Sequence, residues 1–532
     1  MAPRRRSASN KSDEVDDNIV EGTRRGRRSS RSASPQVKRS ILKSSSRSPT
    51  PKSSSSSAKK GIRFTAEVIQ KHQAENGVDD DFEYEFGGTP GALGIIFGLP
   101  LVIYLLYFLS SKDYECLMTS NLINLDFDWK NFVENIVPHN FNEYYTYKSL
   151  QIYLAWMLFQ VILERILPGE RVVGVKPYEL IYYMSGHLQF WLSIMLLVFG
   201  NFSITELSKG TDAFKGWDAV YVVNSISSFD LSILYDEYLG LITASCIFSF
   251  VLSIYLYISS FMKDGSGEEK VLAHGGNTGK CIYDFFIGRE LNPRLFNNSL
   301  DLKEFCELRP GLIGWCILNI GMAYKQYQLK GYVSFSMVLV VLYQGGYVWD
   351  ALYNERAILT TMDITTDGFG YMLAFGDLAW VPFIYSLQAR YLVEYDPNLS
   401  YMELIIISLL HFLGLYIFRK SNSEKDAFRR DPDSSANAHL KYMPTKRGTK
   451  LLVSGWWGMA RKINYTGDWI ITFAWCLLCG YDSPIPYFQA LYFLILLIHR
   501  ADRDDKMCAE KYGDDWEEYK RKVPYMFIPY VI

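Results

Sequence analysis

The sequence predicts an all-α polytopic membrane protein with about ten transmembrane helices, preceded by a disordered basic tail rich in Ser and Arg. Two observations carry this prediction. Apolar runs near the length of about 20 residues that a bilayer requires recur from Gly91 onward. The residues before them contain few aromatic side chains and many Ser, Arg and Lys. We therefore divide the chain into a tail, residues 1–85, and a membrane body, residues 86–532.

The tail differs from the body in charge. Residues 1–63 contain 17 Lys and Arg against 5 Asp and Glu, whereas the remaining residues contain 38 and 52. A segment of this composition buries too little apolar surface to offset its conformational entropy, so we expect it to be disordered. A basic arm joined to an acidic body indicates an anionic partner for the arm.

The body contains ten apolar segments that we predict to be membrane spans. In chain order they are Gly91–Leu109, Leu150–Leu167, Leu180–Phe199, Tyr238–Phe261, Gly311–Tyr324, Val333–Val348, Tyr371–Tyr391, Met402–Phe418, Trp469–Cys479 and Tyr487–Ile498. The loops after the second, fourth, eighth and tenth segments are rich in Lys and Arg, and those after the first and third are acidic. The positive-inside rule then places both termini on the cytoplasmic or nucleoplasmic side.

Three polar and aromatic stretches interrupt the apolar pattern: Leu359–Ala389, Leu451–Asp468 and His499–Tyr519. Carboxylates at membrane depth are costly unless they line a cavity or find partners. Paired acids between closely packed helices are the alternative interpretation. Arg and Lys donate to phosphates, while Trp and Tyr rings can stack on a flat base. A dinucleotide with an extra phosphate would use both.

Other cofactor chemistries find less support in the sequence. No G-x-G-x-x-G follows a predicted strand, so a Rossmann domain is not indicated. Cys476 and Cys479 form a CxxC inside an apolar run with no second pair. This spacing alone favours a buried structural pair over a metal or redox site, and we predict no metal.

Three motifs follow one another in the body: Gly279–Arg294, Asp363–Gln388 and His499–Tyr519. In this order they resemble the signatures of the lamin B receptor / Δ14-sterol reductase family. The resemblance runs from about Phe86 to Ile532. The basic arm before it resembles the family members that join a chromatin- and lamin-binding tail to a reductase body.

The resemblance implies a membrane enzyme that uses NADPH to reduce the Δ14 double bond of sterol intermediates in sterol biosynthesis. It also implies a sterol pocket within the bilayer and a cofactor site on the cytoplasmic side. The expected location is the inner nuclear membrane and the endoplasmic reticulum. A sterol substrate and membrane lipids would be partners of the body, and chromatin, DNA and lamin would be partners of residues 1–63.

The family's cofactor contacts match polar and aromatic positions that follow the eighth predicted span. The residues of this sequence at the matching positions are Lys425, Arg429, Leu452, Trp457, Asn464, Tyr465, Arg500, Asp504, Cys508, Lys511, Tyr512 and Tyr519. Cys508 also reads as a packing residue that only touches the cofactor. The chain departs from the family's usual pattern at Thr366, at Lys462-Ile463, at Trp469 and at Met526, and it shows no counterpart of a Tudor domain.

The expected reaction needs a proton donor as well as a hydride donor, because hydride attacks only an electron-poor carbon. Protonation of the alkene at carbon 15 would leave a tertiary cation at carbon 14, and hydride would then be delivered there. An anionic or aromatic field would stabilise the cation. Candidates for the proton route are Asp504, with Arg500 holding its charge, Tyr347 and Asp367. A cofactor-clamp role for Asp504 and pocket-lining roles for the other two stay open.

The basic residues of the arm, such as Arg4–Arg6 and Arg24–Arg28, are dispersed and have no aromatic residues among them. This pattern favours sequence-independent phosphate contact. Arg28–Ser32 and Arg47–Pro51 resemble substrates of Arg/Ser-directed and proline-directed kinases, whose phosphates would cancel the positive charge. Lys60–Phe64 resembles a docking motif for protein phosphatase one. A plain soluble tail or a retention signal is the alternative interpretation.

Three other functions remain open at this point. The body could be a nuclear-envelope scaffold that has lost reductase activity, although Arg500, Asp504, Asn464 and Tyr519 are all present. It could also be a Δ7-sterol reductase or an isoprenylcysteine methyltransferase, whose C-terminal half looks similar. The Asp363–Gln388 motif argues against the methyltransferase, and within it Asp367-Gly368-Phe369-Gly370 reads more like the Δ14 type than the Δ7 type.

Overall fold

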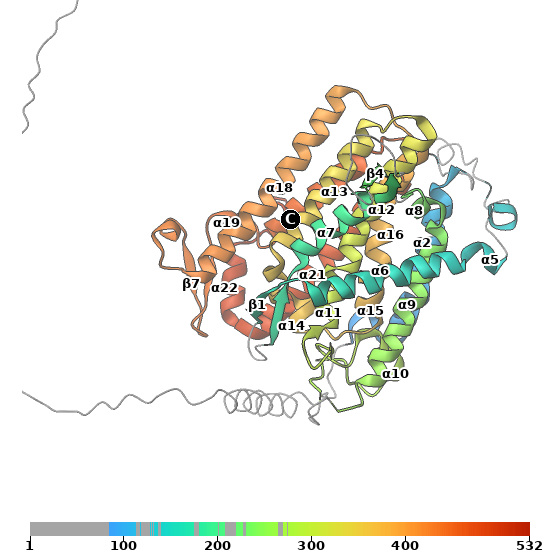
Figure 1. Cartoon of the computed structure of the whole chain (residues 1–532). Helices are drawn as coiled ribbons and strands as arrows, with labels where there is room; N and C mark the ends of the chain where they lie inside the picture. Colours follow the sequence, from blue (N-terminus) through green and yellow to red (C-terminus); the bar gives the residue numbers. More distant parts are fainter. Residues whose placement is uncertain are drawn as a thin grey trace, which may run out of the picture. The chain divides into compact units, whose positions relative to one another are not determined.

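The computed structural model describes residues 84–112, 118, 128, 130, 132–136, 140–174, 180–199, 202–207, 220–226, 230–263, 270–273 and 275–531. The predicted basic arm therefore lies outside the described residues, and its disorder stays a prediction. Within the described part the chain is mostly helical (Figure 1).

Nine of the ten predicted spans each fall on one long helix of the described chain. These helices are α2 (Gly88–Ser110), α6 (Tyr147–Ile166), α7 (Gly186–Phe199), α9 (Tyr238–Ser259), α12 (Pro310–Lys330), α13 (Phe335–Tyr353), α18 (Tyr401–Arg430), α20 (Ile463–Leu477) and α21 (Phe488–Tyr512). The segment predicted over Leu180–Phe199 was too long at its start, because its first residues form a strand instead.

The span predicted over Tyr371–Tyr391 is broken into short pieces. They are α15 (Tyr371–Phe375), the π-helix η6 (Gly376–Trp380), α16 (Val381–Tyr385) and α17 (Leu387–Glu394). Pro382 lies within the first turn of α16, where its missing N–H and fixed φ fit the start of a new helical segment. A π-turn at this place often accompanies a functional site.

Four of the described helical segments are both long and apolar enough to cross a bilayer: Glu85–Ser110, α9, α13 and α18. The number of ten spans is therefore not confirmed and stays a prediction. Some of the other helices carry buried polar side chains that pair inside the bundle. For example, Asn319 of α12 donates to Gln344 Oε1 of α13 over 2.6 Å. Such pairs lower the apparent hydropathy of a helix that protein, not lipid, surrounds.

Within the described residues, four two-stranded antiparallel hairpins accompany the helices, which the all-α prediction did not include. They are β1 (Glu170–Val173) with β2 (Ile181–Met184), β3 (Phe202–Leu207) with β4 (Val220–Ile226), β5 (Arg294–Leu295) with β6 (Leu300–Asp301), and β7 (Tyr442–Pro444) with β8 (Lys450–Leu452). Each hairpin pairs the backbone of a connecting segment with itself, which satisfies N–H and C=O groups outside the helices.

The remaining described elements are short. They are η1 (Glu85–Gly87), η3 (Phe132–Ile136), α5 (Phe141–Tyr144), α8 (Ile233–Asp236), α10 (Cys281–Ile287), α11 (Leu302–Leu308), η5 (Glu355–Thr360), α14 (Met362–Thr365), η7 (Ser435–Asn437), α19 (Trp456–Met459), η8 (Ile485–Tyr487) and α22 (Asp514–Lys522).

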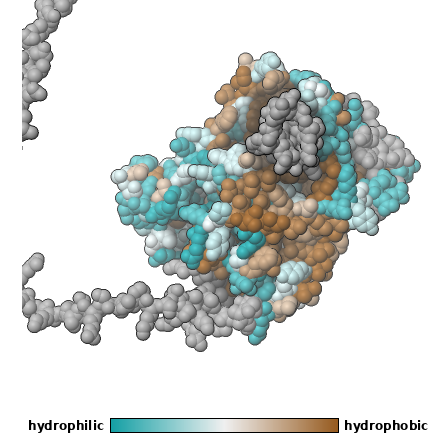
Figure 2. All heavy atoms as spheres, viewed as in Figure 1, coloured by the Kyte–Doolittle hydropathy of each residue, from teal (hydrophilic) through white to brown (hydrophobic). Residues whose placement is uncertain are grey.

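The outer surface of the bundle suits a lipid environment. On α18 the side chains of Ile405, Ile406, Leu409, Phe412 and Leu413 are each more than half exposed. Figure 2 shows brown apolar surface across the middle of the helices, with teal polar surface at the end that carries α19, α22 and β7 and also along the opposite edge. A broad exposed apolar face on a long helix is costly in water and favourable in a bilayer.

The glycines of two predicted motifs bring those motifs into backbone contact. A Cβ added to Gly288 would lie 2.3 Å from the backbone nitrogen of Gly370, so no side chain fits there. The N–H of Phe369 donates to the carbonyl of Glu290 over 3.0 Å. The motif Gly279–Arg294 therefore packs directly on the motif that begins at Asp363, although about 80 residues separate them in the chain.

A buried ionic cluster joins four elements: α6, α11, η5 and the start of α12. Arg309, at the start of α12, is fully buried and pairs with Glu164 of α6 over 3.0 Å and with Glu355 of η5 over 2.7 Å. It also pairs with Glu304 of α11. Removing one partner of such a cluster would leave an uncompensated buried charge, so the cluster fixes how these elements meet.

Candidate cofactor and reaction site

The polar half of α21 carries three charged residues on one face. Arg500, Arg503 and Asp504 lie three and four positions apart, which places them on one side of a helix. Arg500 and Asp504 are predicted cofactor residues, whereas Arg503 was not among the predicted residues. Its spacing from the other two was the signal that could have revealed it.

Each of the two arginines binds a carboxylate of the Asp363–Gln388 motif with two hydrogen bonds. Arg500 Nη1 and Nη2 donate to Asp363 over 3.1 and 2.8 Å. Arg503 Nη1 and Nη2 donate to Asp367 over 3.1 and 2.7 Å. Burial alone would lower the pKa of Arg500, but Asp363 raises it above its ordinary value. Paired forks of this kind fix geometry as well as charge.

Asp367 was predicted as one of the possible proton donors. In the structure its two carboxylate oxygens both accept from Arg503, in the paired geometry that holds a guanidinium against a carboxylate. The structure thus shows the contact of Asp367 with Arg503, and a role of Asp367 as proton donor stays a prediction.

A fully buried lysine supports the same turn from the other side. Lys303 of α11 donates from Nζ to the carbonyls of Ile364, over 3.2 Å, and Asp367, over 2.7 Å. Burial lowers the pKa of Lys303 to about 8, although the carboxylates of Asp301 and Asp367 oppose this shift. The sequence analysis missed Lys303, because nothing in a helical segment before α12 indicates which carbonyls its side chain will reach.

A second group of charges surrounds Asp504 of α21. Lys462 forms an ion pair with Asp504, and Lys425 and Arg429 of α18 act on the same carboxylate. Burial alone would raise the pKa of Asp504, but Lys462, Lys425 and Arg429 together hold it below its ordinary value. Burial and the nearby Arg429 and Lys462 lower the pKa of Lys425 to about 7, so an anionic ligand placed among these three side chains would be stabilised by them and would favour the charged form of Lys425.

An aromatic wall stands beside these cations. The ammonium group of Lys425 lies 4.0 Å from the ring centroid of Trp457. Trp457 is buried and donates from Nε1 to the carbonyl of Ser421 over 2.8 Å, so the ring is fixed in place. Leu452 packs with Trp457 and Phe428 in a small core behind it. Leu452 therefore supports the wall rather than adding a polar contact.

Asn464 contains a buried acceptor with no partner in the described part of the protein. Its Nδ2 donates to Asn422 Oδ1 over 3.3 Å, while its Oδ1 is buried and accepts no hydrogen bond. Native structures rarely leave such atoms unsatisfied, so an unpaired one needs an explanation such as a ligand or a water. Tyr465, next to it, lies with its ring centroid 5.8 Å from Lys462 Nζ.

The last predicted cofactor residues line the junction of α21 and α22. Tyr519 stacks on Trp516 with ring centroids 5.0 Å apart, and Tyr512 stacks on the same indole at 6.2 Å. Cys508 Sγ lies 3.9 Å from Asp504 Oδ2. Burial raises the pKa of Cys508 to about 11, so the thiol keeps its proton and its packing role is favoured. Lys511 is exposed beside Tyr512.

These residues fit a phosphorylated dinucleotide. Lys425, Arg429 and Lys462 supply positive charge on one side, and Trp457 and the α21–α22 tyrosines supply aromatic faces. The unsatisfied Oδ1 of Asn464 supplies an acceptor for an amide or hydroxyl group. Cations and flat rings together are what phosphates and bases require.

A second cluster lies deeper in the bundle, around Tyr347 of α13. Its hydroxyl donates to Asp468 Oδ1 of α20 over 3.1 Å, and its ring lies edge-on to Trp475 at 5.4 Å. Tyr385 acts electrostatically on Tyr347 and lies within electrostatic range of both Asp468 and Arg500. The cluster therefore stands between the interior of the bundle and the charged face of α21. Asp468 and Tyr385 fell inside the polar stretches that the sequence singled out, but their pairing with Tyr347 depends on helix packing.

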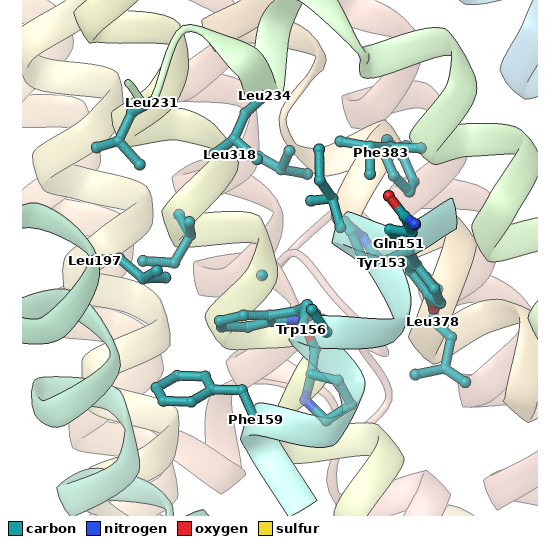
Figure 3. Close-up of a pocket in the computed structure, with 17 residues that line it drawn as sticks. Gln151, Tyr153, Trp156, Phe159, Leu197, Leu231, Leu234, Leu318, Leu378 and Phe383 are labelled. Atoms are coloured by element: carbon teal, nitrogen blue, oxygen red, sulfur yellow. The ribbon is translucent and has the colours of Figure 1, made fainter. Parts of the chain in front are cut away.

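An apolar cavity of 490 Å³ occupies the opposite side of α12 (Figure 3). Its walls come from α6, α7, α8, α9, α12, η6 and α16, and include Trp156, Phe159, Leu197, Leu318 and Phe383. Among the described residues that line it, Tyr153 alone is titratable, and its hydroxyl donates to the carbonyl of Leu378. The cavity can therefore hold an apolar molecule but offers it no free acid.

Together the fold and the site define a multi-pass helical membrane protein with a cationic, aromatic-lined site at one end of its bundle. Comparison with known proteins places this class more narrowly. A sequence model of the ergosterol biosynthesis ERG4/ERG24 family matches residues 80–532. The chain belongs to this family, which confirms the predicted sterol reductase resemblance.

Named relatives show the same family. The chain is 42% identical over 459 residues to Delta(14)-sterol reductase erg24 of Schizosaccharomyces pombe, which covers 85% of this chain and 98% of that protein. It is 41% identical over 459 residues to ERG24 of Saccharomyces cerevisiae, with 84% and 98% covered. It is also 41% identical over 452 residues to Delta(14)-sterol reductase LBR of Gallus gallus, which covers 84% of this chain and 64% of that protein.

Proposed function

We propose that this protein reduces the Δ14 double bond of sterol intermediates with NADPH. The observation that carries the proposal is the cation and aromatic site around Asp504, next to the Tyr347–Asp468 pair, in a chain whose full-length relatives are named Δ14-sterol reductases. NADPH would supply the hydride. The chain itself must bind the cofactor, orient it and deliver a proton.

The cofactor residues divide by what they offer. Lys425, Arg429, Lys462 and Lys511 would neutralise phosphates, and the exposure of Arg429 and Lys511 fits the rim of such a site. Trp457, Tyr465, Tyr512 and Tyr519 would contact flat rings, Asn464 would accept from the cofactor through Oδ1, and Leu452 and Cys508 would pack behind it. Arg500 would hold α21 through Asp363.

The proton would come from the inner cluster. In the proposed sequence, the sterol C14=C15 bond takes a proton at carbon 15 from the Tyr347 hydroxyl, and the hydride then reaches the cation at carbon 14. Asp468, which accepts the Tyr347 hydrogen bond, would orient the phenol, and after turnover a proton taken up from water would pass through Asp468 to the phenolate. Asp504 has a cation partner in Lys462, so a charge-clamp role suits it better than donation.

The membrane arrangement forms part of the same proposal. We propose ten spans, with the broken segment α15–α17 counted as one, and both termini on the cytoplasmic or nucleoplasmic side. The likeness to LBR supports a location in the endoplasmic reticulum and the inner nuclear membrane. The arm would then face chromatin and the lamina, and Arg/Ser-directed kinases and protein phosphatase one would set its charge.

Complementation of a Δ14-reductase-deficient yeast strain tests the activity, with Δ14-sterols followed by mass spectrometry. The wild-type chain should remove the Δ14 intermediate, and Arg500→Gln should not. Arg356→Gln is the matched control, because Arg356 forms only an exposed ion pair with Glu170, and such pairs contribute little. If the well-expressed wild-type chain leaves the intermediate in place, the protein is a scaffold. If Δ7-sterols disappear instead, it is a Δ7-sterol reductase.

A further inference from the structure

The segment that leads into the first span has an unusual backbone. Phe86, Gly87 and Gly88 have φ values of 54°, 75° and 68°. Two glycines adopt this left-handed region at little cost, but a residue with a bulky side chain rarely does. A strained residue persists only where the surrounding contacts hold it. The contacts of the Phe86 side chain must therefore hold this backbone conformation.

The side chain of Phe86 packs on two signature motifs at once. Its ring stacks on the imidazole of His499, with centroids 5.0 Å apart and planes 30° apart. It also meets Phe286 edge-on at 5.6 Å. His499 immediately precedes Arg500 on α21, and Phe286 lies in α10, within the motif that packs on the Asp363 turn. Phe86 thus packs between the start of the polar half of α21 and helix α10.

Glu85 makes an ionic contact with the same helix. Its Oε1 accepts from Arg503 Nε over 2.8 Å, while Nη1 and Nη2 of Arg503 bind Asp367. All three nitrogens of this guanidinium therefore bind a carboxylate, and Glu85 binds the Nε that Asp367 does not bind. The backbone N–H of Glu85 donates to Tyr283 Oη over 3.1 Å. This hydrogen bond fixes the backbone from which the Glu85 side chain extends toward Arg503.

We propose that Glu85 and Phe86 are positioning residues of the cofactor site, which set the affinity for NADPH by holding the polar half of α21 against the Asp367 turn. This proposal rests on the proposed function, because it takes α21 to be the cofactor helix. Asp504, adjacent to Arg503 on α21, pairs with Lys462. A rotation of α21 that released Arg503 would therefore also move the charge that organises the cations around Asp504.

The test uses the full-length chain in detergent or vesicles and two kinds of variant. Glu85→Gln removes the charge and keeps the shape, whereas Phe86→Gly removes the ring and relieves the backbone, so folding should be preserved. Phe86→Tyr keeps the ring as the conservative variant. Glu170→Gln is the matched control, since Glu170 is an exposed glutamate paired only with exposed Arg356.

NADPH titration and steady-state kinetics with a Δ14-sterol give the readout. Glu85→Gln and Phe86→Gly should each raise the NADPH Kd and KM by roughly tenfold, the scale of a partly buried charge-assisted contact, with kcat within about twofold of wild type. Phe86→Tyr and Glu170→Gln should match wild type. In an Arg503→Gln background, Glu85→Gln should add nothing, because the two residues act through one contact.

The outcomes separate this inference from the proposed function. If both variants bind NADPH like wild type while Arg500→Gln binds it weakly, the inference is overturned and the proposed function stands. A fall in kcat with unchanged KM also overturns it, because positioning of the cofactor is then not what was lost. A wild-type chain that does not bind NADPH overturns both.

Discussion

Arg500 and Asp363 form two parallel hydrogen bonds, of 3.1 and 2.8 Å, across 137 residues of sequence. This fork ties the motif at the C-terminal end of the chain to the motif at the broken helical segment. Asp363→Asn removes one charge and leaves Arg500 without its partner, so we expect a loss of about 2 kcal/mol in unfolding free energy. Thermal unfolding in detergent measures it.

The same substitution should weaken NADPH binding. Asp502→Asn, an exposed carboxylate that pairs with Lys506 on the same helix, is the control and should leave both quantities unchanged. Equal stability of Asp363→Asn and wild type would show that the fork does not hold α21.

The ion pair between Lys462 and Asp504 predicts a dependence on acid. The pKa of Asp504 lies below its ordinary value because cations outweigh its burial. The stabilisation is therefore complete above the pKa of the unfolded chain, about 4, and is lost as the pH falls through the folded pKa. Lys462→Met should reduce this acid dependence by on the order of 1 kcal/mol or less, since the pair is partly exposed. Unfolding at pH 3 to 7 provides the measurement, and identical profiles for both chains would refute the pairing.

Lys303 predicts a second dependence, at alkaline pH and with the same sign. Burial lowers its pKa to about 8, so between about pH 8 and the ordinary lysine pKa near 10.4 the unfolded chain holds a proton that the folded chain has released. Stability should therefore rise with pH in this window from this group. Lys303→Met should remove the rise.

Lys303→Met should also cost about 1–3 kcal/mol at neutral pH, because the carbonyls of Ile364 and Asp367 lose their donor. Lys520→Met serves as the control, since Lys520 pairs with Glu517 of α22 and Asp505 of α21 and does not reach the carbonyls of Ile364 and Asp367. A variant that keeps the alkaline rise would assign it to another group.

Tyr347→Phe tests the proton route. If Tyr347 donates the proton, kcat should fall by about 10²-fold or more, while the NADPH KM stays near that of wild type. Tyr343→Phe is the matched control one turn earlier on α13, where the hydroxyl binds Ser408 instead. It should lower stability by about 1 kcal/mol with little change in kcat. A Tyr347→Phe enzyme with normal kcat would exclude the phenol as donor.

Gly288→Ala tests the contact between the two motifs. The new Cβ would lie 2.3 Å from the backbone of Gly370, and the φ of 98° at Gly288 is itself unfavourable for a side chain. We expect a loss of several kcal/mol or failure to fold. Gly346→Ala, which has open space around the added carbon, should be tolerated. Comparable expression and unfolding temperatures for the two variants would contradict the contact.

Particular elements show how much of the secondary structure could be predicted from local sequence. Apolar runs such as Tyr238–Phe261 and Met402–Phe418 predicted helices that the structure places at α9 and α18. The sequence analysis missed strand β2 (Ile181–Met184), because a short apolar run suits a strand or a helix equally. It also treated Tyr371–Tyr391 as one span, although Pro382 marked where the helix would break.

By itself the sequence determined the family and the positions of most helices, and it supplied the residue types of the proposed cofactor site, because apolar periodicity and short motifs are local properties. The tertiary structure alone decided the partners: Arg500 with Asp363, Arg503 with Asp367 and Glu85, and Tyr347 with Asp468. The physical reason is that a charge or hydroxyl is local, whereas its partner is chosen by which helices the buried glycines and apolar faces bring together.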